Sequence, residues 1–288
     1  MHGSREPNRS AGKKVAQWLD RSAGWAAASC IIPWPALAAQ LHLLVPLRKG
    51  LWALGFTAAF ALSARALRAV TTLGAVVGGV LAFLLFIAGG PGTFAVLVAV
   101  FLVTWIATRI GHGRKRRLGT AEDRSGRSAV QVGANVAIPA LAVLAGVASR
   151  HPAAWLVAAS ASLAELAADT VSSELGQAVS DSAYLITDFR PVPVGTNGGI
   201  SVIGSLAGAA GAIAVTTVAL ASGIIAAHWW LPVMAAGTLG MFVDSVLGAT
   251  LERRGWLNND AVNLLSTLVA ALFALFLYWS RHGELPLF

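Results

Sequence analysis

Long runs of apolar residues dominate this chain and restrict it to few kinds of fold. The runs 70–88 and 93–107 contain no charged residue. About 20 apolar residues in a helix cross a hydrocarbon core about 30 Å thick, and several runs approach that length. Only 12% of the residues are charged, whereas about a quarter are charged in a soluble domain. The sequence therefore predicts an all-α, polytopic integral membrane protein.

The apolar residues fall into about nine segments, with no separate soluble domain between them. These segments lie near residues 25–45, 51–66, 69–88, 92–109, 131–149, 153–170, 200–226, 231–250 and 261–280. Prolines interrupt the first segment, and Arg65 and Arg68 shorten the second, so each is either a crossing helix or a re-entrant or interfacial one. The predicted organisation is a basic N-terminal tail (1–24), one transmembrane domain (25–280) and a short C-terminal tail (281–288).

Basic residues divide unequally between the two sides of the membrane. If all nine segments cross, one side receives all of the 21 Lys and Arg residues except Arg48, Lys49, Arg150 and Arg281. The positive-inside rule then places the N-terminus and this basic side in the cytoplasm. We expect the protein to lie in the cytoplasmic membrane of the cell. The basic run 114–117 is interpreted as a topology signal that contacts lipid headgroups. The net charge of +8 therefore reflects topology, and we expect membrane lipids rather than nucleic acid as partners.

The polar residues gather in the connections on the predicted cytoplasmic side. The connections 111–135, 169–201 and 252–263 are long and polar, whereas those on the opposite side are short. We therefore expect an active site that faces the cytoplasm.

Four carboxylates lie in or beside apolar segments. Glu165 and Asp169 are four residues apart and so share a helix face, Glu174 follows, and Asp244 lies in a later segment. Acidic residues in a membrane segment need a partner or a polar cavity. One interpretation is a magnesium site in which Asp169, Glu174 and Asp244 are catalytic ligands and Glu165 is an additional one, because Mg²⁺ binds a few carboxylates together with substrate phosphates. The other interpretation is that these residues cap or solvate helix ends in the headgroup region.

A loop rich in glycine and proline (187–199) leads into the segment near 200–226. Its end, formed by Gly195, Thr196, Asn197, Gly198 and Gly199, permits positive φ and close approach of backbone to a ligand. Backbone N–H groups before a helix N-terminus favour phosphate. No Gly-Lys-Ser/Thr follows, so this is not a Walker A loop, and an ordinary turn with a helix cap is an equal alternative.

Further polar residues are candidates for phosphate binding. Arg127 has a planar guanidinium suited to phosphate, and Gln131 and Asn135 follow at intervals of four on the same helix face. Arg190, in the glycine- and proline-rich loop, and Asn263, near the start of the last segment, complete the set.

Five motifs in a fixed order carry a family resemblance. They are GRSAVQVGAN (126–135), AELAADTVSSELG (164–176), ITDFRPVPVGTNGGIS (186–201), DSVLGAT (244–250) and NNDAVN (258–263). Together they resemble the membrane-protein family that contains plant phytyl-phosphate kinase, over about residues 50–280. The chain is also distantly similar to the CTP-dependent polyprenol and dolichol kinases, whose Asp-x-x-x-Ser pattern is matched by Asp169 and Ser173.

The resemblance implies transfer of a phosphoryl group from a nucleoside triphosphate, with CTP or UTP favoured over ATP, to a prenyl monophosphate such as phytyl phosphate. Phosphoryl transfer needs positioning and neutralisation of charge, which Mg²⁺ carboxylates and phosphate-binding residues supply. Two alternatives remain. One is a transporter or flippase for a lipid phosphate or small anion, since intramembrane acids and a segment broken by Gly and Pro also fit that class. The other is a CTP-dependent prenyl alcohol kinase.

Overall fold

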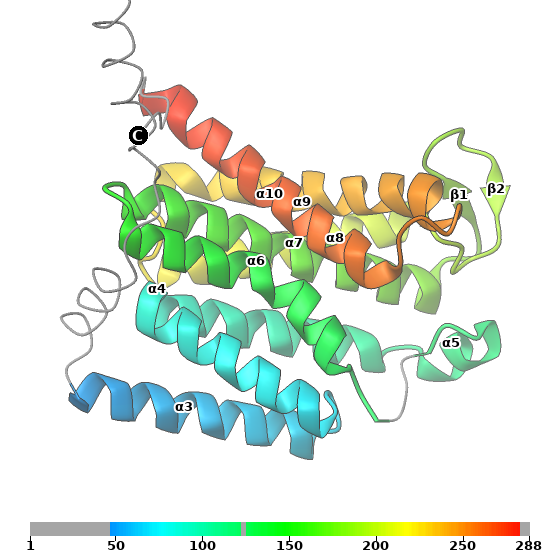
Figure 1. The fold of residues 1–288 in the computed structure, drawn as a ribbon. Coiled ribbons are helices and arrows are strands. Elements are labelled where there is room, and N and C mark those ends of the chain that lie inside the picture. The colour runs from blue at the N-terminus through cyan, green and yellow to red at the C-terminus, as the bar shows by residue number, and fades with distance from the viewer. Residues whose placement is uncertain (1–46, 122–124, 283–288) are drawn as a thin grey trace, which may run out of the picture. The chain divides into compact units, whose positions relative to one another are not determined.

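The computed structural model describes residues 47–121 and 125–282, in which the chain is almost entirely helical (Figure 1). The predicted N-terminal tail, the predicted segment near 25–45 and residues 283–288 lie outside the described residues. The helices are α3 (Leu47–Ala66), α4 (Thr72–Arg109), α5 (His112–Leu118), α6 (Ala129–Ala148), α7 (Pro152–Val179), α8 (Val202–Ala221), α9 (Trp230–Leu247) and α10 (Asn259–His282). A 3₁₀ turn, η1 (Ala227–Trp229), precedes α9, and a π-helical turn, η2 (Gly248–Glu252), follows it.

Six helices of the described part are long and apolar enough to cross a membrane. They are Thr72–Arg109, Ala129–Ala148, Pro152–Val179, Val202–Ala221, Ala227–Glu252 and Asn259–His282. The helix α3, with Arg48, Lys49 and Arg65 near its ends, is not among them. The all-α membrane class is therefore confirmed, whereas nine crossings and a cytoplasmic N-terminus stay predictions.

The helix α4 reverses its direction in the middle. Gly90 has φ 86° and ψ 173°, which breaks the helix, and Pro91 begins the next turn. The rings of Phe86 and Phe94 have centroids 5.6 Å apart, although a straight helix would separate these residues by about 12 Å along its axis. The two halves of α4 therefore form an antiparallel pair, visible side by side in Figure 1, and correspond to the two predicted segments 69–88 and 92–109.

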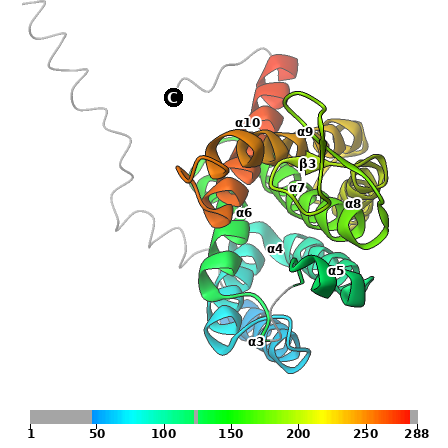
Figure 2. The same cartoon turned by 90° about the vertical axis from the view of Figure 1, so that its right-hand side faces the viewer.

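The helix α7 lies at the centre of the bundle and contacts α4, α6, α8, α9 and α10 (Figure 2). In its most apolar stretch 83% of the residues are buried, against at most 44% in the other candidate spans. Small residues permit this close packing, as membrane helix interfaces require. A Cβ atom on Gly237 of α9 would lie 2.8 Å from the Cβ of Ala164, and one on Gly211 of α8 would lie 3.1 Å from the Ala167 carbonyl oxygen. Polar residues of α7 are consequently held inside the bundle.

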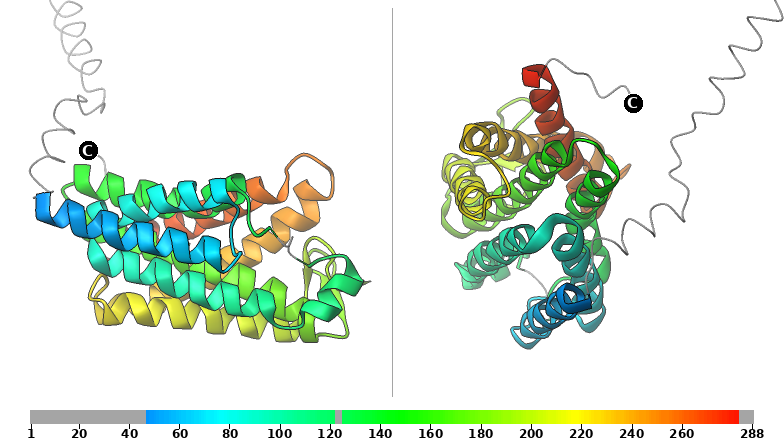
Figure 3. Two further views of the ribbon diagram at one scale, coloured as in Figure 1. Left: turned by 90° about the horizontal axis from the view of Figure 1, so that it is seen from below. Right: turned by 90° about the vertical axis from the view of Figure 1, so that its left-hand side faces the viewer.

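The polar connections meet at one end of the bundle, which we call the polar end (Figures 1 and 3). A three-stranded antiparallel sheet lies there, formed by β1 (Ala183–Leu185), β2 (Pro191–Val192) and β3 (Gly199–Ile200) in the order β2-β1-β3. Ala183 pairs with Val192, and Leu185 pairs with Gly199. This small sheet is an addition to the expected all-α fold, and it folds the glycine-rich loop back over the ends of the helices.

Candidate active site

Two aspartates from different helices form the centre of the candidate site. The carboxyl groups of Asp169 on α7 and Asp244 on α9 lie within hydrogen-bonding reach of each other. The Ser266 hydroxyl on α10 donates to Asp244 Oδ2 at 3.3 Å. Two carboxylates so close in a medium of low dielectric constant repel each other unless a proton or a cation is shared between them. The pair is therefore suited in its chemistry to hold a cation.

Both aspartates line a polar cavity of about 200 Å³ at the polar end. Its other walls come from the last turns of α7, from the glycine-rich loop, from the junction of α9 and η2, and from the start of α10. The lining residues include Ser172, Ser173, Gln177, Gly195, Thr196, Asn197, Gly198, Gly199, Ser201, Ser245, Glu252 and Asn259. The charge of Glu252, which sequence reasoning missed, acts on both Asp169 and Asp244.

Glu165 lies one turn below Asp169, deeper in the bundle. It is only 1% exposed, and its Oε1 atom has no hydrogen-bond partner among the described residues. Beside this group, the Asn263 amide lies between two helices, 3.0 Å from Asn135 Oδ1 and 3.2 Å from Asp244 Oδ2. Asn135 and Asn263, which we predicted to bind phosphate, link α6 and α10 to Asp244 in this structure.

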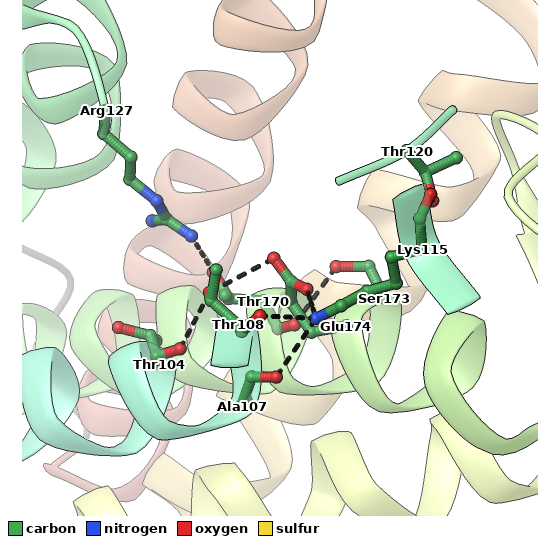
Figure 4. A network of polar contacts seen from close by, with 9 residues as sticks. All are labelled: Thr104, Ala107, Thr108, Lys115, Thr120, Arg127, Thr170, Ser173 and Glu174. Atoms are coloured by element: carbon green, nitrogen blue, oxygen red, sulfur yellow. Dashed lines mark hydrogen bonds and ion pairs between the residues drawn. The ribbon is translucent and has the colours of Figure 1, made fainter. Parts of the chain in front are cut away.

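Glu174 belongs to a different polar network, shown in Figure 4. Its Oε2 atom lies 2.5 Å from Lys115 Nζ, and its Oε1 atom accepts from the Thr108 hydroxyl at 3.1 Å. Lys115 is fully buried and also donates to the carbonyl oxygens of Ala107 and Thr108. The Glu174 carboxylate is therefore paired with a lysine, while its charge also acts on Asp169.

Of the four carboxylates predicted to bind metal, the structure places Asp169 and Asp244 in one cavity, whereas Glu174 pairs with Lys115. Within residues 47–121 and 125–282, no group of three or more His, Cys, Asp or Glu side chains is placed to hold a metal ion. What remains is the pair Asp169 and Asp244. Mg²⁺ commonly uses one or two carboxylates and completes its octahedron with water and substrate phosphates, so the pair fits that ion.

Lys115 was not predicted, because it stands within the basic run 114–117. The short helix α5 begins and ends at glycines with left-handed backbone, Gly111 (φ 65°) and Gly119 (φ 74°). These turns fold α5 against α7, so Lys115 points inward while Arg116 and Arg117 are exposed. No spacing in the sequence distinguishes the buried lysine from its neighbours.

Arg127 lies directly before α6, between the two networks. Its Nη2 donates to the Thr170 hydroxyl at 3.5 Å, and its charge acts on Asp169. Gln131, predicted as a phosphate ligand, is a helix cap: its Oε1 accepts from the Ser128 N–H at 2.7 Å, and Ser128 Oγ accepts from the Gln131 N–H. The Ser-x-x-Gln spacing is the sequence signal of this capping box.

The glycine-rich loop packs closely against η2. Gly198 has φ 74°, and a Cβ atom there would contact the backbone of Ala249. The Gly199 N–H donates within the loop to the Thr196 carbonyl oxygen at 2.8 Å. Arg190 is exposed, forms an ion pair with Asp188 at 3.4 Å, and does not line the cavity. The loop therefore brings glycine backbone, but not Arg190, to the cavity wall.

Gly198→Ala should destabilise this wall. A non-glycine residue in the left-handed region costs about 1–2 kcal/mol, and the clash with Ala249 adds about 1–3 kcal/mol. The matched control is Gly223→Ala, where φ is 73° but no atom lies within 4 Å of the new Cβ. Unfolding in detergent should show a clearly larger loss of stability for Gly198→Ala, and equal losses would contradict the close approach.

Comparison with known proteins now identifies the family. The family model "Integral membrane protein DUF92" matches residues 55–271. The chain belongs to the DUF92 family. The match covers all five motifs and every residue of the polar cavity, and it confirms the family inferred from those motifs.

Relatives of this DUF92 protein occur in bacteria, archaea and plants. It is 35% identical to an uncharacterised membrane protein of Synechocystis sp. over 200 residues (68% of this chain and 78% of that one). It is 32% identical to an uncharacterised membrane protein of Methanocaldococcus jannaschii over 212 residues (73% and 87%). It is 29% identical to Protein VTE6, chloroplastic, of Arabidopsis thaliana over 196 residues (65% and 58%). No solved structure matches the chain.

Proposed function

We propose that this protein is an isoprenoid phosphate kinase, which transfers a phosphoryl group from a nucleoside triphosphate to a prenyl monophosphate and forms the diphosphate. The observation that carries the proposal is the pair Asp169 and Asp244 in the wall of a polar cavity, with Arg127 beside Asp169. Similarity to the family that contains plant phytyl-phosphate kinase supports the same reaction class.

The proposed roles follow from the requirements of phosphoryl transfer. Asp169 and Asp244 hold Mg²⁺, which when bound supplies neutralisation of the charge on the phosphates. The cavity takes the triphosphate of the nucleotide, with CTP or UTP favoured over ATP, between the last turns of α7 and the glycine-rich loop. Arg127 binds a phosphate through its planar guanidinium. No strong general base is needed, because the attacking oxygen of a monophosphate is already anionic at neutral pH.

The position of the cavity favours an enzyme over a transporter. Sites of secondary transporters lie near the middle of the membrane between repeated halves. Here the cavity lies at the polar end, among helix ends and a three-stranded sheet. By the positive-inside rule, we place this end at the cytoplasm, where nucleotides are available.

Product formation in detergent tests the proposal. Purified protein is given Mg²⁺, labelled CTP, UTP or ATP, and phytyl or geranylgeranyl monophosphate, and the lipid products are separated. We expect the prenyl diphosphate, and no product when Mg²⁺ is chelated. Folded protein that forms no product with any nucleotide would overturn the kinase. Nucleotide-independent movement of the lipid phosphate across sealed vesicles would establish the transporter instead.

A further inference from the structure

A second and larger cavity lies next to the polar one and is mostly apolar. It has a volume of about 600 Å³ and lies between α3, both halves of α4, α6 and α7. Its apolar lining includes Phe60, Ala64, Gly78, Leu97, Phe101 and Val136. Pockets that enclose a drug-sized ligand measure about 300–1,000 Å³, so this cavity is large enough for a hydrocarbon chain of moderate length.

The cavity also has one charged end. Arg68, Arg109, His112 and Arg127 line it together with the apolar residues. Arg109 is fixed there, since its Nη2 donates to the Leu67 carbonyl oxygen at 2.9 Å and its guanidinium lies 4.3 Å from the centre of the Trp105 ring. Because Leu97 precedes Arg109 by twelve residues on one half of α4, the apolar lining extends about 18 Å from this basic end. A long apolar cavity with a single basic end complements an amphiphile with one chain and an anionic head.

Arg127 lines the apolar cavity and contacts Thr170, the residue that follows Asp169. Its charge acts on Asp169, which lines the polar cavity. A phosphate bound at this arginine would therefore lie at the junction, with its chain on one side and the proposed nucleotide site on the other. Guanidinium groups bind phosphate oxygens in a fixed planar geometry, which would fix the direction of the acceptor.

Gly78 is one of the residues that line the apolar cavity. It is on the first half of α4, facing α6, and a Cβ atom there would make an ordinary contact, 3.4 Å from Val132 Cγ1. Alanine would therefore be tolerated, whereas the outer atoms of a larger side chain would occupy the space beyond. The absence of a side chain at Gly78 therefore leaves room in the cavity.

From these features we infer that the apolar cavity binds the chain of an isoprenoid monophosphate, with its phosphate at Arg127, and that Gly78 limits the chain length accepted. The inference rests on the proposed function for the identity of the lipid. The assignment of the cavity as a lipid-binding site depends only on its lining residues, so it can be tested by binding without any phosphoryl transfer.

The test is equilibrium binding of labelled geranyl, farnesyl and geranylgeranyl monophosphates to the full-length protein in detergent. In Gly78→Leu we expect affinity for geranylgeranyl monophosphate to fall about tenfold or more, since a hydrophobic pocket discriminates by about 10–200-fold for each methylene group that does not fit. Affinity for geranyl monophosphate should stay within about twofold. The matched control is Gly55→Leu on α3, an exposed position with no atom within 4 Å of a Cβ, which should bind all three chains like the wild type.

Competition with phosphatidate distinguishes an isoprenoid site from a general site for phospholipids. Phosphatidate that competes as well as geranylgeranyl monophosphate, or a Gly78→Leu variant that loses all chain lengths equally, would overturn the inference. Selective binding of isoprenoid phosphates without phosphoryl transfer from any nucleotide would contradict the kinase but leave the cavity assignment standing. Phosphoryl transfer to all chain lengths that is unchanged in Gly78→Leu would contradict the cavity assignment but leave the kinase standing.

Discussion

Asp169→Asn should lower the turnover of phosphoryl transfer by about a hundredfold to a thousandfold. Asparagine keeps the shape of the side chain and removes the charge that would hold a cation beside Asp244. Loss of one preorganised group that stabilises charge in the transition state has an effect of this size. The measurement is the rate of prenyl diphosphate formation at saturating nucleotide and lipid. Asp244→Asn should behave alike, because the two carboxyl groups are within hydrogen-bonding reach.

Stability separates loss of the cation from loss of the fold. A bound ligand raises the free energy of unfolding in proportion to the logarithm of its concentration over Kd. Added Mg²⁺ should therefore stabilise the wild type against thermal unfolding and have much less effect on Asp169→Asn. The control is Asp188→Asn, which removes an exposed carboxylate paired with Arg190 outside the cavity and should change neither property.

Two results would contradict these roles. Transfer by Asp169→Asn within about tenfold of the wild type would show that the pair is not the site of charge neutralisation. A variant that retains Mg²⁺ and nucleotide binding but loses turnover, with a pH profile typical of a missing base, would make Asp169 a general base instead.

Lys115→Met should destabilise the protein by about 3–5 kcal/mol, the cost of removing one partner from a buried ion pair. The substitution leaves Glu174 without the ammonium group 2.5 Å from its Oε2, at a side chain that is only 12% exposed. It also removes the donor to the carbonyl oxygens of Ala107 and Thr108. The measurement is thermal or chemical unfolding in detergent, followed by Trp fluorescence.

The double variant Lys115→Met/Glu174→Gln gives the sharper result. Replacing both charges with neutral groups of similar size removes the uncompensated charge, so most of the lost stability should return. Arg116→Met, an exposed neighbour in the same basic run, should change stability by no more than about 0.5 kcal/mol. A double variant as unstable as Lys115→Met would refute the pair as a structural element. So would a Lys115→Met variant that loses no more stability than Arg116→Met.

The sequence alone determined the class of fold, because the length of an apolar run can be read from consecutive residues and compared with the thickness of a membrane. The helices α4, α6, α7, α8, α9 and α10 lie where apolar segments were predicted. The reversal at Gly90 also follows the predicted boundary between two segments, at glycines and a proline. Motifs in a fixed order were sufficient to identify the family.

The partners of the charged residues were decided only by the tertiary structure. Asp169 and Glu174 are five residues apart and therefore point about 140° away from each other around α7. Asp169 faces Asp244 on α9, whereas Glu174 faces Lys115 on α5, and no sequence pattern states which helices pack on which side. Helix periodicity determines the directions in which side chains point around one helix. A binding site depends on which neighbouring helices those side chains face.

The same limit explains the loops and the two cavities. Gln131 and Arg190 have side chains suited to phosphate, yet the first caps α6 and the second lies exposed beside Asp188. Lys115 belongs to a basic run that is typical of a topology signal, but it is buried because α5 folds against α7. The sequence determined which chemical groups are available at the polar end, since these depend on residue type. The packing of distant helices decided which groups share a cavity, because that depends on contacts between residues far apart in the chain.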